Sequence, residues 1–223
     1  MTSSKPEHTG CLIVAIDGPS SSGKGMLAKA VAKVFGFTHF DTGRLYRVFA
    51  KELQNGHLKV LAGKNCIDEE DEKRILALTL AADPAYSTEE AGKLASILGR
   101  NADMRAILLH IQRKFILSSK HGIVVDGRDI ASIVCPEAHV KVFVTAYTSI
   151  RARRRFKQLK LTAGTRRMMF KQVFFSLLQR DIRDSTRKVA PLTRIEGAFY
   201  LNNSHMSEEK SVAELVKKIK TFL

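Results

Sequence analysis

A phosphate-binding loop constrains this chain more than any other feature of its sequence. Residues 12–17 are apolar up to a final aspartate, residues 18–24 follow the pattern G-x-x-x-x-G-K, and a helical stretch comes next. In such a loop, successive backbone N–H groups surround nucleotide phosphates, and the lysine contacts the β- and γ-phosphate oxygens. An ordinary Gly/Ser turn needs neither the preceding strand nor the following helix. The sequence therefore predicts an α/β protein that binds a nucleoside triphosphate.

The remaining sequence alternates apolar strands with helical stretches. We expect further strands at 38–40, 122–125, 139–145 and 198–201. We expect helices at 24–35, 44–54, 69–81, 88–98, 103–118 and 149–187, and one after Ser207. Strands separated by helices favour a parallel, doubly wound sheet in a three-layer fold, with ligands at the carboxyl ends of the strands.

Length and cysteine content narrow the class of protein. The 223 residues fit a single domain, of which residues 1–9 are polar and expected to be disordered. We predict no signal peptide or membrane span, because no apolar run approaches the length of either. The three cysteines, Cys11, Cys66 and Cys135, are distant from one another and form no C-x-x-C pair. This pattern favours buried or incidental thiols in a cytoplasmic protein.

Two acidic motifs follow predicted strands and should share one rim with the phosphate-binding loop. Asp41 and Thr42 end one strand, and Asp126-Gly127-Arg128-Asp129 ends another. A carboxylate in the position of Asp126 commonly holds Mg²⁺ through water, while Arg128 offers a phosphate clamp and Asp129 an acceptor. The alternative is that Asp126-Gly127 is only a turn signal.

The net charge of +15 also needs an explanation. Residues 147–194 hold fourteen Lys and Arg against two acidic residues, and ten of the fourteen are arginine. Arginine suits bidentate phosphate contacts, so we favour a cleft where several phosphates gather. A solvated basic face and a nucleic-acid-binding surface remain as alternatives.

Four motifs together make the chain resemble the bacterial-type cytidylate kinases, a family of nucleoside monophosphate kinases. The motifs begin at Ile16, Asp41, Val125 and Arg180 and read IDGPSSSGKG, DTGRLYR, VDGRDI and RDIRDSTRKVAPL. The resemblance covers nearly all of the chain after residue 10. It implies a P-loop NTPase fold that transfers the γ-phosphoryl of ATP to CMP or dCMP. We expect the protein to be a monomer. It further implies a core at 10–56, 100–148 and 188–223, an acceptor-binding insertion at 57–99 and a helical lid at 149–187.

The resemblance also implies roles for individual residues. For catalysis they are Lys24, Arg128, Asp126 and Arg154. For ATP they are Gly18, Pro19, Ser20, Ser21, Ser22, Gly23, Lys24, Gly25 and Met26 in the loop, with Arg151, Arg154 and Arg155 in the lid. For the acceptor they are Thr42, Ser96, Arg105 and Asp129 around the base, Arg180 and Asp184 at the ribose, and Arg47, Arg128 and Arg187 at the phosphate.

The chain departs from the family pattern at two places. Met26 stands where the family has threonine, and Gly25 where most phosphate-binding loops have Ser or Thr, so neither position offers a hydroxyl to Mg²⁺. We then expect Mg²⁺ to be held by water, by phosphates and by Asp17 or Asp126. Residues 57–95 are also shorter than the family's insertion and lack its Ile-Arg…Val signature. Alternative functions are a kinase for another monophosphate or small metabolite, a nucleic-acid-binding ATPase, and a P-loop protein without turnover.

Overall fold

The sheet has the predicted parallel architecture. The computed structural model describes residues 11–58, 60, 67–162 and 169–222, so the predicted disorder of 1–9 and the thiol of Cys66 lie outside it. Within these residues, five parallel strands form one sheet in the order β2-β3-β1-β4-β5. The strands are β1 (Leu12–Asp17), β2 (Thr38–Asp41), β3 (Gly122–Gly127), β4 (Val140–Thr145) and β5 (Phe199–Asn202).

The helices agree with the predicted ranges to within one or two residues, except that the range 149–187 holds two helices, the second of which begins only after the non-helical Met169. They are α1 (Lys24–Phe35), α2 (Thr42–Gln54), α3 (Glu69–Leu80), α4 (Glu89–Leu98), α5 (Ala102–Leu117), α6 (Thr148–Thr162), α7 (Phe170–Thr186) and α8 (Glu208–Ile219). Shorter turns are η1 (Pro84–Ser87), η2 (Ile130–Val134) and η3 (Lys220–Phe222). The π-helical turn η2 has no counterpart in the sequence prediction. No helix in the described part of the chain combines the length and apolarity needed to cross a membrane.

Local chemistry explains where the helices near the sheet begin and end. The Asp41 side chain accepts a hydrogen bond from the Arg44 N–H, which starts α2 two residues earlier than predicted. Ser207 caps α8, the helix predicted after it, in the same way, and Glu208 and Glu209 lie in the first turn of α8. Gly36 ends α1 in the left-handed conformation at φ 67°, where a side chain would be strained.

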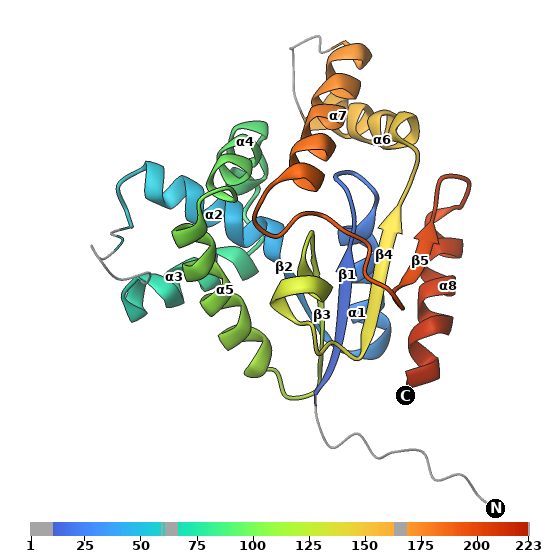
Figure 1. Ribbon diagram of the computed structural model, residues 1–223, viewed down its shortest axis with the longest axis horizontal. Coiled ribbons are helices and arrows are strands. Elements are labelled where there is room, and N and C mark those ends of the chain that lie inside the picture. Colours follow the sequence, from blue (N-terminus) through green and yellow to red (C-terminus); the bar gives the residue numbers. More distant parts are fainter. Residues whose placement is uncertain (1–10, 59, 61–66, 163–168, 223) are drawn as a thin grey trace, which may run out of the picture.

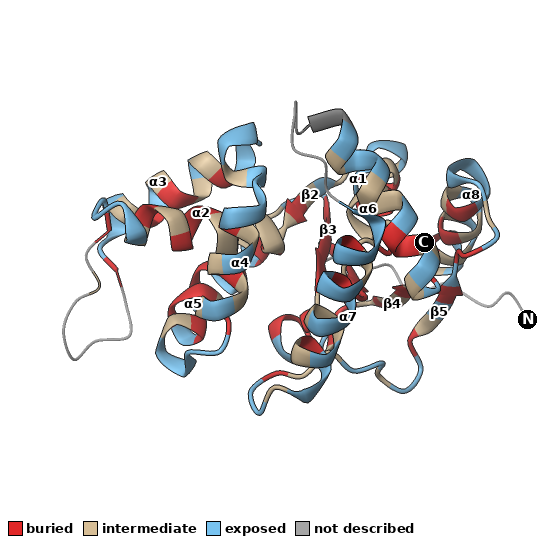
Figure 2. Ribbon diagram, turned by 90° about the horizontal axis from the view of Figure 1, so that it is seen from above, coloured by how far each residue is buried: buried red, intermediate tan, exposed pale blue. Residues whose placement is uncertain are grey.

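Helices cover both faces of the sheet (Figures 1 and 2). Each face buries a separate apolar cluster, as a doubly wound sheet requires. On β1, Ile13 and Ala15 face the cluster built with α2 and α5, whereas Val14 and Ile16 face the cluster built with α1 and α8. Figure 2 shows the central strands as buried, with exposed residues along the outer sides of α4 and α7.

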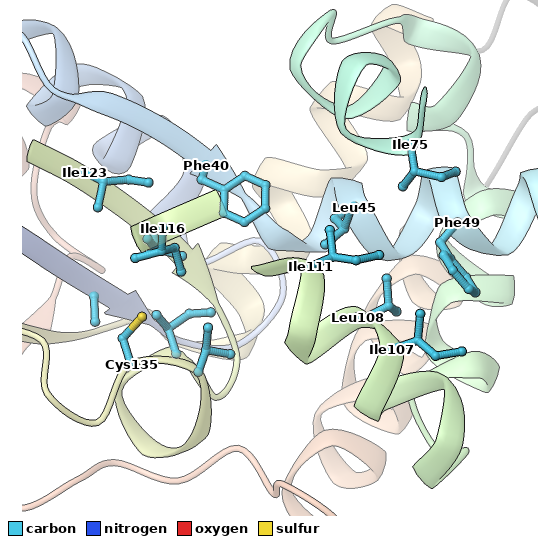
Figure 3. Packing of buried hydrophobic residues seen from close by; sticks show 14 of the residues in the cluster. Phe40, Leu45, Phe49, Ile75, Ile107, Leu108, Ile111, Ile116, Ile123 and Cys135 are labelled. Carbon is cyan, nitrogen blue, oxygen red and sulfur yellow. The ribbon is translucent and has the colours of Figure 1, made fainter. Parts of the chain in front are cut away.

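The first cluster extends well beyond the sheet. Figure 3 shows Phe40 and Ile123 of the strands in one continuous contact region with Phe49 of α2 and Ile75 of α3. These four side chains are fully buried, and each is expected to stabilise the fold by about 1.5–3 kcal/mol. The helices between 69 and 98 therefore share the core of the sheet and are held beside the β2 edge, while α6 and α7 lie over the carboxyl ends of β1 and β4 (Figure 1).

Candidate active site

The three predicted rim motifs line one pocket of about 400 Å³ at the carboxyl ends of the strands. The pocket runs from the phosphate-binding loop past the ends of β2 and β3 to helices α4, α5 and α7. The prediction that these motifs meet is therefore confirmed. Predicted residues that line the pocket are Ser20, Ser21, Gly23, Lys24, Gly25, Met26, Thr42, Arg47, Ser96, Arg105, Asp126, Arg128, Asp129, Arg155, Arg180, Asp184 and Arg187.

The loop is held tightly against the sheet. A Cβ at Gly18, whose φ is 154°, would lie 2.0 Å from the Val144 carbonyl oxygen, so only glycine fits there. Gly23 takes the left-handed conformation at φ 88° and is the N-cap of α1. The Ser22 side chain is fully buried, and its hydroxyl has no hydrogen-bond partner among the described residues. The loop thus places the N-terminal end of α1 at the pocket, where the helix dipole favours an anion.

Lys24 lies in an environment that disfavours its charge. Its ammonium is 3.5 Å from the Pro19 carbonyl oxygen. Burial lowers the pKa of Lys24 to about 7, with a further lowering from the positive charge of Arg128. Asp126 and Asp41 act in the opposite direction. An anionic ligand beside Lys24 would stabilise its charged ammonium, which burial otherwise disfavours.

The two predicted metal carboxylates point to opposite faces of the sheet. Asp17 accepts hydrogen bonds from the backbone N–H groups of Ile130 and Ala131, both at 2.8 Å, and burial raises its pKa to about 6. Both Asp17 oxygens therefore hold η2, and Asp17 does not line the pocket. Asp126 lines it, and its Oδ1 lies 2.8 Å from Nε2 of His39. Asp17 therefore has a structural role, and the expectation that it holds Mg²⁺ is not supported.

At the far end of the pocket, Asp129 is held by two arginines. Arg105 donates a hydrogen bond from its guanidinium to Oδ2, and an Arg187 nitrogen lies 3.7 Å from Oδ1. The Asp129 side chain makes no capping hydrogen bond to the following turn η2, so it remains directed at these arginines. Tyr46 lies beside this cluster, its ring centroid 5.9 Å from the Arg105 guanidinium carbon. Asp129 is buried, and so is Thr42, whose hydroxyl donates to the Asp126 carbonyl oxygen at 2.8 Å.

Between Lys24 and this cluster the pocket is strongly basic. Arg128 donates to Asp184 at 3.0 Å and Arg47 donates to Asp41 at 3.2 Å, whereas the Arg180 nitrogen is 3.9 Å from Asp184. Burial lowers the pKa of Arg180 to about 10. The Nε atoms of Arg47 and Arg180 are buried without a hydrogen-bond partner in the described part of the chain. Such donors are costly when unpaired, so the middle of the pocket is suited to phosphate oxygens.

The three predicted lid arginines occupy different places. Arg151 is buried outside the pocket, where it donates to the Ala146 and Ser20 carbonyl oxygens and pairs with Asp181 at 2.6 Å. Arg154 lines an adjoining cavity of about 340 Å³ together with Arg155. Arg155 borders both cavities and pairs with Glu89 of α4.

Sequence reasoning missed several polar residues around the site. Asp41 was expected at this rim but was given no role, and Tyr46 was recognised only as part of a motif; both line the pocket. His39 beside Asp126 and Asn203 beside the loop were missed because nothing local marks them. Their contacts depend on how distant strands pair.

Comparison with known proteins agrees with this geometry. A family model for cytidylate kinases matches residues 14–221. The cytidylate kinase of Rhodospirillum rubrum is 40% identical over 90% of this chain and 93% of its own length. That of Azorhizobium caulinodans is 40% identical over 91% and 95%.

Solved structures support the fold alone. A shikimate kinase from Bacteroides thetaiotaomicron superposes with a TM-score of 0.51 at 12% identity, covering 94% of this chain and 98% of that one. An uncharacterized protein from Eubacterium ventriosum gives 0.55 at 15% identity with the same coverage. The fold is that of the P-loop NTPases, and with the family match over almost its whole length the chain belongs to the cytidylate kinase family.

Proposed function

We propose that this protein transfers the γ-phosphoryl group of ATP to CMP or dCMP, producing ADP and the diphosphate. The observation that carries the proposal is the Arg105–Asp129 pair in the same pocket as Lys24. One end of the pocket offers a phosphate-binding loop, the other a carboxylate fixed by a guanidinium, and arginines lie between. This order matches a donor phosphate chain, an acceptor phosphate and a base with an amino group.

On the donor side, the loop amides and Lys24 would hold the β- and γ-phosphates. Phosphoryl transfer requires positioning and charge stabilisation more than covalent chemistry from the protein. The cavity beside Arg154 and Arg155 adjoins the loop and would take the nucleoside part of the donor. In this proposal α6 and α7 act as the lid that excludes water from the reacting phosphates.

On the acceptor side, Arg128, Arg47 and Arg187 would bind the α-phosphate of the monophosphate. Asp129 would accept a hydrogen bond from the 4-amino group of cytosine. Uracil presents a carbonyl at that position, which would leave two acceptors facing each other.

Further acceptor contacts complete this proposal. Thr42, Ser96 and Arg105 would complete the base site, and Arg180 and Asp184 would contact the ribose. The segment with α3 and α4 would act as the acceptor-binding insertion.

The residues at the loop fit an indirectly bound Mg²⁺. Gly25 and Met26 bring no hydroxyl, but a Cβ added at Gly25 would lie 3.6 Å from Oδ2 of Asp126, so that oxygen faces the loop. Asp126 would therefore hold the Mg²⁺ of the donor nucleotide through water. When bound, Mg²⁺ neutralises charge on the donor phosphates.

A coupled assay of ADP release across all nucleoside monophosphates tests the function. We expect CMP and dCMP to be phosphorylated in preference to UMP, AMP and GMP. Equal use of UMP, or turnover stimulated by nucleic acid in place of a monophosphate, would contradict the proposal. A cytoplasmic monomer completes the proposal, and light scattering of the purified protein tests its monomeric state.

A further inference from the structure

Asn203, the residue directly after β5, is 2% exposed although it is polar. Its backbone N–H donates to the Thr145 carbonyl oxygen at 3.0 Å, and its side-chain Nδ2 donates to the Ser22 carbonyl oxygen at 2.9 Å. Its side-chain and backbone oxygens each accept a hydrogen bond of 2.9 Å from Arg154. One buried residue thus joins the β5–α8 connection, the phosphate-binding loop and helix α6.

The contact with Ser22 controls the direction of a loop amide. In a planar trans peptide, the carbonyl oxygen and the next N–H point in opposite directions. Because Asn203 holds the Ser22 carbonyl on the outer side of the loop, the Gly23 N–H points away from Asn203, toward the inner side of the loop. Arg151 holds the Ser20 carbonyl at 3.1 Å and fixes the Ser21 N–H in the same sense. The inner side is where a phosphate-binding loop uses its amides.

The contact with Arg154 fixes a positive charge beside the same loop. Arg154 donates to both oxygens of Asn203 and, at 3.3 Å, to the Ser22 carbonyl. A Cβ at Gly23 would lie 3.7 Å from its guanidinium. An arginine on a helix surface normally samples many rotamers, and ordering it costs entropy on binding. Asn203 has ordered this one before any ligand arrives.

We propose that Asn203 is a positioning residue for the donor phosphates: it aims the Gly23 amide and holds Arg154 beside the phosphate-binding loop. The inference rests on the proposed function only in naming the donor nucleotide as the ligand. It assigns no contact between Asn203 and the reacting atoms.

Tripolyphosphate is the probe that separates this role from others, because it lacks the base and ribose that the cavity near Asn203 would contact. We expect Asn203→Ala to weaken tripolyphosphate binding about tenfold in calorimetry, because the Ser22 carbonyl and Arg154 both lose a buried partner. KM for ATP should rise by a similar factor, while KM for CMP stays within about twofold.

Asn202→Ala is the matched control. Asn202 is the preceding residue, and its side chain accepts hydrogen bonds from the Ser204 N–H at 3.1 Å and the Ser204 hydroxyl at 2.6 Å. Asn202→Ala perturbs the same connection, but within the described part of the chain Asn202 makes no hydrogen bond to the phosphate-binding loop, so tripolyphosphate binding should stay unchanged. Equal weakening in both variants would assign the effect to general loosening of the connection and overturn the proposal. Unchanged binding in Asn203→Ala would overturn it as well.

Asn203→Asp keeps the acceptor for Arg154 but faces the Ser22 carbonyl with an acceptor in place of a donor. We expect it to bind tripolyphosphate at least as weakly as Asn203→Ala, and it serves in the same measurement if the alanine variant does not fold. If Asn203→Asp binds tripolyphosphate as tightly as the wild type does, Asn203 does not aim the Gly23 amide. A wild-type protein that binds tripolyphosphate but does not phosphorylate CMP would refute the proposed function and leave the role of Asn203 standing.

Discussion

Binding of the donor nucleotide should take up a proton at Lys24. Burial and the neighbouring Arg128 lower the pKa of Lys24 to about 7, so at pH 8 about nine in ten molecules hold it uncharged. Phosphate oxygens next to the amine favour its charged form and raise that pKa again. Binding of ADP at pH 8 should therefore take up about 0.9 proton.

Calorimetry of ADP binding in buffers of different ionisation enthalpy measures this number directly. At pH 8 the phosphates of ADP are already ionised, because their last pKa lies near 6. The control is Lys24→Arg, which keeps a charge that arginine does not give up at this pH. It should bind ADP without the extra proton. An uptake near zero in the wild type, or the same uptake in Lys24→Arg, would refute the reasoning.

The same pKa shift predicts how stability depends on pH. Between about pH 7 and 10.5 the unfolded chain binds a proton at Lys24 that the folded chain does not. The contribution of Lys24 to the free energy of unfolding therefore rises with pH across this range. Below about pH 7 the folded state carries the full cost of a buried ammonium. Lys24→Met removes that cost, so the ligand-free variant should melt above the wild type at pH 7, which a thermal scan checks.

Further outcomes follow from the same geometry. Lys24→Met should lower kcat by about 10²–10³ in the coupled assay, because it removes a charge that stabilises the transferring phosphoryl group, and retention of a tenth of kcat would contradict this role. Arg128→Ala should lower kcat/KM for CMP while calorimetry finds ADP affinity unchanged, and equal weakening of ADP would move Arg128 to the donor site. Asp129→Ala should lower kcat/KM for CMP more than kcat/KM for UMP, and an unchanged ratio of the two would show that Asp129 does not select the base. Phe49→Ala should lower the free energy of unfolding by about 3–5 kcal/mol in urea titrations, since Phe49 is fully buried, and a loss below about 1 kcal/mol would contradict its place in the core.

Much of the fold could be predicted from the sequence because its signals are local. The apolar run of β1, the glycine pattern after it and the cap at Gly36 each act within a few residues of chain. The parallel sheet followed from strands separated by helices, and the shared rim followed from the direction of those strands. Resemblance to a family, and not spacing, predicted that Arg105 and Asp129 both lie around the base, and the structure pairs them.

The directions of the two acidic side chains at the ends of β1 and β3 were decided by tertiary structure. Asp17 continues the face of Ile13 and Ala15 and meets η2, whereas Asp126 continues the face of Val124 and meets the loop. Both end an apolar strand, so the sequence alone left them as equal candidates for the metal. The structure distinguishes them because η2 lies against Asp17, whereas the phosphate-binding loop lies near Asp126.

The supports of the phosphate-binding loop depend entirely on tertiary structure. Asn203 contacts Ser22 across 181 residues of chain, and Arg154 contacts it across 132. The sequence marked the loop, because its conformation needs glycine at defined positions. It did not mark Asn203, because an asparagine after a strand looks the same whether it faces solvent or a buried carbonyl. Only the pairing of β4 with β5 brings that side chain to the loop.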